Sequence, residues 1–325
     1  MKSRIKIMRL AGCCVCIALL FCSSIMLDPS YALDTDPPFD ARGAMGEDVV
    51  KMLDGASKEA YVSRNMQTGE ITVSEPNPTA FKDITEIPPY IPEGLKIAEP
   101  LSPGSKAIIG DDNRFEISDV AAFPFSAMVY IEASYEDGTM GYGSGVFVTP
   151  TTILTSGTVI YNPSSGWALD TYVYPGNFES GSSKVTSASY IRTLNGWIGN
   201  VDDFYDFGLI ELSSSLDTGA FGVKLQDDEN LLDHVILNYG YPYEFDKNRG
   251  SLWYGVGSIL SVTPAQFKHD ADGVYGNSGG PIVLQMDPHN IVGIYASSSP
   301  DPSTNYAYRA TKRLLNLILS YPGPA

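Results

Sequence analysis

The chain has 325 residues, of which 38 are acidic and 21 basic, so its formal net charge at pH 7 is −17. This balance argues against nucleic acid or an anionic membrane surface as a partner, and it fits a cationic substrate or simple solubility better. The length exceeds one average domain, but barrel proteins built from two sheets commonly use about 200 to 250 residues as one unit. We therefore expect one such domain preceded by a long N-terminal extension.

The first 32 residues have the pattern of an export signal. Basic residues between Lys2 and Arg9 precede an apolar run over residues 10–27, and Ser30-Tyr31-Ala32 supplies small residues for a cleavage site. We predict that residues 1–32 are a signal peptide cleaved after Ala32, and that the product is secreted and extracellular, with no membrane attachment. An uncleaved membrane anchor is the alternative, because the apolar run is almost long enough to span a bilayer.

All four cysteines of the chain lie inside this apolar run, at positions 13, 14, 16 and 22. The processed protein would contain none, so no disulfide can stabilise it and the packed core must do so. The letters Leu10-Ala11-Gly12-Cys13 match a lipoprotein signal, but the apolar stretch follows them instead of preceding them, and we interpret the match as coincidence. We predict no cofactor and no metal ion.

Residues 33–106 contain few apolar clusters and many prolines. Such a stretch does not easily bury enough surface to fold alone. We interpret it as a propeptide or flexible leader of largely irregular structure, with a plain linker as the alternative. A weak amphipathic helix near residues 46–61 is the only regular element that the pattern predicts there.

From residue 107 onward, short runs of β-forming residues alternate with Gly, Pro, Asn and Asp, which is typical of a sandwich or barrel. One helix is predicted over residues 310–320, where apolar residues recur at helical spacing before Tyr321-Pro322-Gly323. The predicted strands are residues 125–133, 145–149, 152–156, 169–174, 206–212, 235–239, 252–260, 281–285 and 291–296.

The most informative segment is Gly276-Asn277-Ser278-Gly279-Gly280-Pro281. Acyl transfer by serine needs a hydroxyl on a tight turn whose backbone N–H groups face the developing oxyanion, and glycines allow that close approach. The segment leads directly into a predicted apolar strand. We therefore predict Ser278 as a nucleophile and the N–H groups of Gly276 and Ser278 as an oxyanion hole, with an ordinary glycine-rich loop as the alternative.

Asp206 stands at the start of the predicted buried strand 206–212. In a Ser-His-Asp site a buried carboxylate orients the imidazole and stabilises its protonated form. We predict Asp206 as this orienting acid, and an aspartate that merely caps a strand is the alternative.

These segments resemble the V8-like glutamyl endopeptidases of the trypsin-like serine peptidases, from about residue 107 to the C-terminal helix. The resemblance implies an all-β fold of two six-stranded antiparallel β-barrels with a C-terminal helix, in residues 107–325. It also implies a zymogen activated by cleavage near Lys106-Ala107. The motifs that carry it are Ala107-Ile108-Ile109-Gly110-Asp111-Asp112-Asn113-Arg114, Gly143-Ser144-Gly145-Val146, Gly240-Tyr241-Pro242, the nucleophile segment and Val292-Gly293-Ile294.

In this family the catalytic histidine stands in a Leu-Thr-x-x-His-Val block, and the corresponding residues here are Leu154-Thr155-Ser156-Gly157-Thr158-Val159. Thr158 therefore occupies the place of the histidine. A hydroxyl cannot take up a proton near neutral pH and pass it to a leaving amine, so general acid–base catalysis is lost at this position. The chain has three histidines, and we expect all of them at the surface or in a pocket wall: His234, His269 and His289.

The glutamate preference of the family depends on a histidine on the strand after the nucleophile, and here that position is Tyr295. Asp272 matches the residue that floors the primary pocket of trypsin-like enzymes, where a buried carboxylate would select Lys or Arg. We treat Asp272 and Tyr295 as candidate substrate-binding residues, with an exposed Asp272 as the alternative.

Two functions follow from this pattern, both with a polypeptide as substrate or ligand. The first is a secreted serine endopeptidase that hydrolyses peptide bonds weakly, or with a histidine of the bound peptide as its base. The second is an inactive pseudopeptidase that binds peptides or partner proteins. A Thr158→His substitution should create or greatly raise peptidase activity, because it restores the missing proton carrier, and comparing it with the native protein is the most informative assay.

Overall fold

The computed structural model describes residues 39–77, 79–99, 101, 112, 114–176, 186–244, 250–298 and 303–321. The predicted signal peptide, the Lys106-Ala107 junction and most of the predicted motif at residues 107–114 lie outside the described residues. Residues Phe39–Ala325 group into one compact unit. No helix among the described residues combines the length and the apolar character that crossing a membrane requires.

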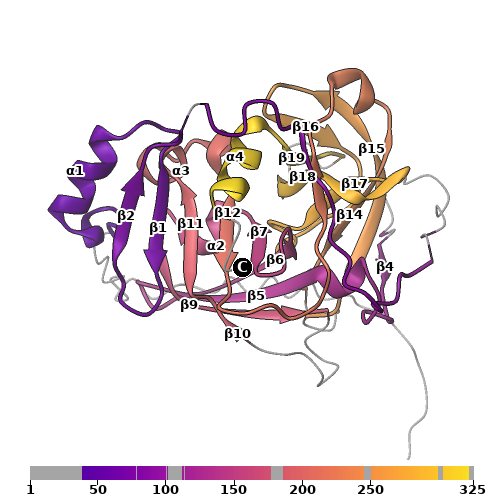
Figure 1. Ribbon diagram of the computed structural model, residues 1–325, viewed down its shortest axis with the longest axis horizontal. Coiled ribbons are helices and arrows are strands. Elements are labelled where there is room, and N and C mark those ends of the chain that lie inside the picture. The colour runs from indigo at the N-terminus through magenta and orange to yellow at the C-terminus, as the bar shows by residue number, and fades with distance from the viewer. Residues whose placement is uncertain are drawn as a thin grey trace, which may run out of the picture. The chain divides into compact units, whose positions relative to one another are not determined.

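The first sheet has ten strands, six of which form the continuous antiparallel series β9-β5-β6-β7-β12-β11 (Figure 1). The short strands β8 and β10 pair with β9, while β1 and β2 extend the sheet beyond β11. The strands of this sheet are β1 Tyr61–Asn65, β2 Ile71–Ser74, β5 Met128–Tyr135, β6 Met140–Phe147, β7 Thr152–Thr155, β8 Tyr161–Asn162, β9 Gly166–Pro175, β10 Thr186–Ser187, β11 Tyr190–Leu194 and β12 Gly208–Glu211.

The second sheet closes on itself, because the series β17-β14-β15-β16-β19-β18 is joined at its ends by pairing of β17 with β18. Shorter strands attach to this barrel: β13 to β18, β3 to β13 and β4 to β15. The prediction of two six-stranded antiparallel barrels is confirmed. The strands of this sheet are β3 Glu86–Ile87, β4 Phe115–Glu116, β13 Gly222–Lys224, β14 Val235–Gly240, β15 Trp253–Val262, β16 Gln266–His269, β17 Pro281–Leu284, β18 Asp287–Ser298 and β19 Asn305–Arg309.

Each predicted strand from residue 125 onward overlaps a strand of the structure, but β11, β16 and β19 are absent from the prediction. These three strands mix charged or amide side chains with apolar ones, so they lack the apolar runs that mark the others. Arg192 of β11, for example, pairs with Glu211 on the neighbouring strand β12.

Helices are short and few among the described residues. The predicted terminal helix is confirmed as α4 Lys312–Ser320, which buries Leu314, Leu315, Leu317 and Ile318. The predicted helix near residues 46–61 is confirmed as α1 Glu47–Gly55. The remaining helices are α2 Gly157–Ile160, α3 Asn195–Asn200 and the 3₁₀ turns Gly43–Met45, Phe125–Ala127, Asp203–Tyr205 and Asp228–Asn230.

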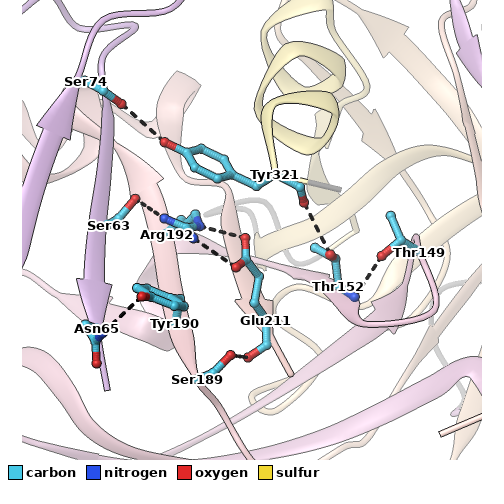
Figure 2. Close-up of polar contacts among 10 residues, drawn as sticks. All are labelled: Ser63, Asn65, Ser74, Thr149, Thr152, Ser189, Tyr190, Arg192, Glu211 and Tyr321. Atoms are coloured by element: carbon cyan, nitrogen blue, oxygen red, sulfur yellow. Dashed lines mark hydrogen bonds and ion pairs between the residues drawn. The ribbon is translucent and has the colours of Figure 1, made fainter. Parts of the chain in front are cut away.

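The segment before residue 100 is more regular than its sequence indicates, because α1 is followed by the β1–β2 hairpin, which pairs with β11. We call residues 39–99 the leader. Tyr61 and Val62 of β1 are only 5% and 0% exposed. Figure 2 shows that side chains also join the hairpin to the barrel: Arg192 donates to Ser63 Oγ. The leader alone has too few apolar residues for a core, but it completes the core of the barrel.

Candidate active site

Ser278 lies in the turn that leads into β17, as the sequence predicted for a nucleophile loop. Gly276 has a φ of +95°, and a Cβ on it would approach the carbonyl oxygen of Tyr241 to 2.4 Å. Gly279 has a φ of +84°, and a Cβ there would come within 2.6 Å of Ser156 N. The turn therefore needs glycine at both positions. Its packing on Ser156 brings Ser278 beside the segment that carries Thr158.

Ser144 on β6 holds the nucleophile turn in place, a role that the sequence motifs did not reveal. Its hydroxyl donates to the carbonyl oxygen of Gly276 at 2.7 Å and accepts from the N–H of Tyr241 at 2.9 Å. Its own N–H donates to the carbonyl oxygen of Ser278, also at 2.9 Å. Ser144 is completely buried, so these bonds are shielded from water. Three motifs that are far apart in the sequence meet at this one side chain.

The backbone N–H groups of Gly276 and Ser278 are the predicted oxyanion hole. No hydrogen bond from either N–H to a protein acceptor is found within the described part of the chain. The neighbouring N–H groups are used: Asn277 donates to the carbonyl oxygen of Val274 at 3.0 Å, and Gly279 to that of Tyr295 at 3.0 Å. Two uncommitted donors that flank a serine hydroxyl are what stabilises the negative oxygen of an acyl-transfer intermediate.

Asp206 and Thr158 are directly bonded. The N–H of Thr158 donates to Asp206 Oδ1 at 2.6 Å, and its hydroxyl donates to Oδ2 at 2.9 Å. Thr158 is the second residue of the single turn α2, and Asp206 stands two residues before the start of β12. The residue that stands in the place of the histidine thus keeps the contact to the acid that an imidazole would make.

Asp206 is 4% exposed, and this burial raises the pKa of its carboxyl group to about 6. Hydrogen bonds from Thr158 and from the hydroxyl of Tyr308 act in the opposite direction, because they stabilise the charged form. Tyr308 lies on β19, and burial raises the pKa of its hydroxyl group as well. Sequence reasoning missed Tyr308, because nothing in the pattern of β19 points to a partner on another barrel.

The hydroxyl of Ser278 donates to the carbonyl oxygen of Ala296 at 3.3 Å, and none of the three histidines bonds to it. His234 is exposed, with Nδ1 at 3.1 Å from the carbonyl oxygen of Leu232. His289 packs on the ring of Phe123 at a centroid distance of 5.0 Å. The geometry around Ser278 therefore contains a hydroxyl, an uncommitted pair of N–H groups and no imidazole.

His269 is fully buried in β16, neither of its ring nitrogens has a hydrogen-bond partner, and burial lowers its pKa to about 3. It stays neutral at ordinary pH, so it cannot act as a charged group in the site. Its ring lies 6.1 Å from that of Tyr295, between centroids. A histidine in the core differs from the surface or pocket-wall position that we expected.

Tyr295 fills the space where the sequence places the primary pocket. It is 1% exposed, and its hydroxyl donates to Asn305 Oδ1 at 3.3 Å. A Cβ on Gly273 would come within 2.4 Å of the Tyr295 ring, so the ring lies directly against the backbone that follows Asp272. Asp272 itself is partly buried, and its carbonyl oxygen accepts from Asn238 Nδ2 at 2.8 Å.

Three aromatic side chains lie beside the nucleophile turn, and no motif in the sequence marks them. Tyr275, directly before Gly276, is 60% exposed, and Tyr243 is 42% exposed. The rings of Tyr243 and Tyr142 are stacked with centroids 4.6 Å apart, and those of Tyr243 and Tyr275 meet edge to face at 5.9 Å. Exposed aromatic rings next to a reactive group commonly contact a bound ligand.

The chain is similar in sequence to two curated proteins along most of its length. It is 26% identical over 291 residues to an extracellular metalloprotease of Bacillus subtilis, covering 88% of this chain and 92% of that protein. It is 27% identical over 317 residues to glutamyl endopeptidase of Bacillus licheniformis, covering 92% of this chain and 87% of that protein. No protein-family model matches the chain.

Solved structures share the two-barrel fold. A Glu endopeptidase in complex with MPD superposes with a TM-score of 0.57 at 24% identity, covering 66% of this chain and 98% of that one. The protease Anisep from Arthrobacter nicotinovorans gives 0.54 at 16% identity, covering 64% of this chain and 98% of that one.

The name of the Bacillus subtilis relative refers to a metal. Within the described ranges, no three or more His, Cys, Asp or Glu side chains are grouped so that they could hold a metal ion.

Proposed function

Because the chain has the chymotrypsin-like fold and is similar to glutamyl endopeptidases, we propose that it is a secreted serine-peptidase homologue that binds polypeptides and hydrolyses them weakly at best. The resemblance to V8-like endopeptidases predicted from the motifs is confirmed by these similarities. One observation supports the proposal: Thr158, which the sequence predicts at the position of the general base, donates both its N–H and its hydroxyl to Asp206. The acid is held, but among the described residues no imidazole bonds to the hydroxyl of Ser278.

The parts of the site that remain can bind and polarise a peptide. Uncommitted N–H groups of Gly276 and Ser278 would bind the carbonyl oxygen of a peptide bond, and Ser278 would lie next to its carbon. Without a base the hydroxyl is a poor nucleophile, and the leaving amine receives no proton. Loss of the histidine from such a triad lowers turnover by about 10⁶-fold, and what is left comes from the oxyanion hole and binding.

A non-catalytic binding protein is the second candidate, and the Thr158–Asp206 pair favours it. Both carboxylate oxygens of Asp206 already accept a hydrogen bond from Thr158, so the acid has no need of a histidine to be satisfied. The Thr158–Asp206 pair therefore needs no catalytic partner, as expected of a protein that binds without hydrolysing. Under this reading the exposed rings of Tyr243 and Tyr275 contact a bound peptide.

Secretion and processing are part of the proposal. The Bacillus subtilis relative is named an extracellular protein, which supports secretion of this chain after removal of residues 1–32. We propose that residues 33–106 form a pro-segment and 107–325 the peptidase-like domain, with cleavage near Lys106-Ala107. The net charge of −17 favours polypeptides that carry positive charge.

The decisive experiment compares the native protein with the Thr158→His and Ser278→Ala variants. A fluorophosphonate probe measures acylation at Ser278, and a mixed peptide library measures cleavage. We expect slow labelling of the native protein, labelling and cleavage at least about 10³-fold faster for Thr158→His, and neither for Ser278→Ala. Peptide binding by fluorescence anisotropy should be equal for native and Ser278→Ala.

Two results would contradict the proposal. Labelling of the native protein as fast as that of Thr158→His would mean that a base acts from elsewhere. A folded Thr158→His variant that stays inert would mean that the site is misplaced. A third result would contradict only part of the proposal. If the native protein binds no peptide while Thr158→His cleaves peptides, the proposed binding function is wrong, but the proposed absence of a general base is supported.

A further inference from the structure

The leader contacts the segment of the domain that ends in Asp206. Asn195, at the start of α3, is 4% exposed, and its side-chain nitrogen lies 2.9 to 3.2 Å from three leader carbonyl oxygens, those of Leu53, Ala56 and Ser57. The backbone N–H of Asn195 donates to the carbonyl oxygen of Ala60 at 2.8 Å. Removing the leader would break these hydrogen bonds and expose to water a surface of the domain that is now buried.

Ion pairs continue the contact along the same segment. Lys58 of the leader lies 2.9 Å from Asp202, and Glu59 lies 2.8 Å from Arg313 on α4. Arg313 also donates to the carbonyl oxygen of Phe204 at 2.8 Å, and its guanidinium lies 3.9 Å from the centroid of the Tyr205 ring. The leader and α4 thus enclose residues 202–205, which lead directly into Asp206.

The same segment contacts the Thr158 side of the site. Trp197 on α3 donates to the carbonyl oxygen of Tyr161 at 2.9 Å. A Cβ on Gly157 would come within 2.8 Å of the Trp197 ring and 2.9 Å of Asp206 Oδ1, so α3 packs against the turn that presents Thr158. Asn195 of α3 therefore contacts the leader, while Trp197 lies beside Gly157, the residue before Thr158.

A third group of contacts holds the hairpin itself. Arg192 on β11 makes a two-pronged ion pair with Glu211 at 2.7 and 2.9 Å and also donates to Ser63 of β1. Its guanidinium lies 3.8 Å from the centroid of the Tyr321 ring, and the hydroxyl of Tyr321 is 3.2 Å from that of Ser74 on β2 (Figure 2). The side chains of Arg192 and Glu211 are only 11% and 8% exposed, so their ion pair is shielded from water while the leader is in place.

We propose that the leader is a permanent partner of the domain, which stays bound after the chain is cut near residue 106 and holds the Asp206 segment in position. The docking surface on the domain consists of β11, residues 195–205 and α4. The occupant is residues 47–74 of the same chain. The cut near residue 106 and the importance of Asp206 rest on the proposed function, whereas the docking of the leader does not.

The first test introduces a recognition sequence for a site-specific protease at residues 103–107 of the full chain. After cleavage, gel filtration of a dilute sample measures whether the leader fragment elutes with the domain. We expect equal molar amounts in one peak, and separation only in denaturant. Elution of the fragment apart from a domain that is still folded by circular dichroism would overturn the proposal.

The second test measures amide hydrogen exchange at Thr158, whose N–H donates to Asp206, and at residues 196–205. Asn195→Ala and the milder Arg313→Gln remove leader contacts, and we expect exchange about tenfold faster at these amides, with β5 unchanged. Lys96→Gln is the matched control, because Lys96 pairs with Asp119 at 2.9 Å away from this segment.

Equal exchange in Arg313→Gln and Lys96→Gln would show that the leader does not position Asp206. Neither test uses peptide binding or catalysis. Failure of the proposed function would therefore leave both outcomes interpretable.

Discussion

Thr158 caps the carboxylate of Asp206 with two hydrogen bonds, one from its N–H at 2.6 Å and one from its hydroxyl at 2.9 Å. In a working triad the second of these bonds comes from an imidazole whose other nitrogen faces the serine. The side chain of threonine has no nitrogen that could face the serine. Under the proposed function, proton transfer therefore stops at Thr158, although the carboxylate of Asp206 is still held.

Replacement of Asp206 by Asn should change how stability depends on pH. The folded pKa of about 6 lies above the ordinary value of 3.8, so the folded protein binds this proton more tightly. The stabilisation of the folded state by this tighter proton binding is fully present below pH 3.8 and is lost as the pH rises through about 6. Native protein should thus gain on the order of 3 kcal/mol relative to Asp206→Asn between pH 7 and 4, measured by urea unfolding. Parallel curves for the two proteins would contradict this.

Replacement of Arg192 by Met should destabilise the protein strongly. It leaves the carboxylate of Glu211 buried without its partner, which costs about 3 to 5 kcal/mol, and it frees the hairpin that carries Ser63. Lys224→Met is the matched control, since Lys224 pairs with Asp287 at 3.4 Å with both side chains partly exposed, and such pairs contribute about 0 to 1 kcal/mol. Equal losses in chemical denaturation would show that the Arg192 cluster does not hold the hairpin.

The turn that carries Ser278 could be predicted from sequence because it depends on residues with special backbone requirements. Gly276 and Gly279 adopt positive φ angles beside the backbone of distant strands, and few other residues tolerate this. The block that contains Thr158 was equally recognisable, and the structure places Thr158 in contact with Asp206. What each residue bonds to was not visible in the sequence.

Two contacts show why the rest could not be predicted. Ser144 supports the nucleophile turn through Gly276, and Tyr308 donates to Asp206, but each partner lies far away in the chain. The leader hairpin is a similar case, because β1 pairs not only with β2 but also with β11, which lies far away in the chain. A local pattern reports the preference of a segment, and these segments are fixed by distant partners.

Replacement of Tyr295 by Ala should open the primary pocket. The ring lies against Gly273 and is 1% exposed, so its removal leaves a space next to Asp272. We expect the native protein to bind peptides with small side chains at the position before the scissile bond. Tyr295→Ala should bind Lys or Arg there about tenfold more tightly, as seen on peptide arrays.

Tyr295→Phe is the control, because it removes only the hydroxyl that donates to Asn305. A similar preference in all three proteins would mean that neither Tyr295 nor Asp272 shapes the pocket. The cavity also costs about 3 to 5 kcal/mol, so folding of Tyr295→Ala is checked first.

A histidine in the bound peptide should restore part of the lost catalysis. Ser278 lacks a proton acceptor, since its hydroxyl donates only weakly, at 3.3 Å, to the carbonyl oxygen of Ala296. An imidazole supplied by the substrate beside the scissile bond can take that proton and return it to the leaving amine. We therefore expect cleavage about 10² to 10⁴-fold faster for peptides with histidine at one defined position, and none in Ser278→Ala. Mass spectrometry of a histidine-scanned library measures this, and rates equal to those of a histidine-free library would assign the cleft to binding alone.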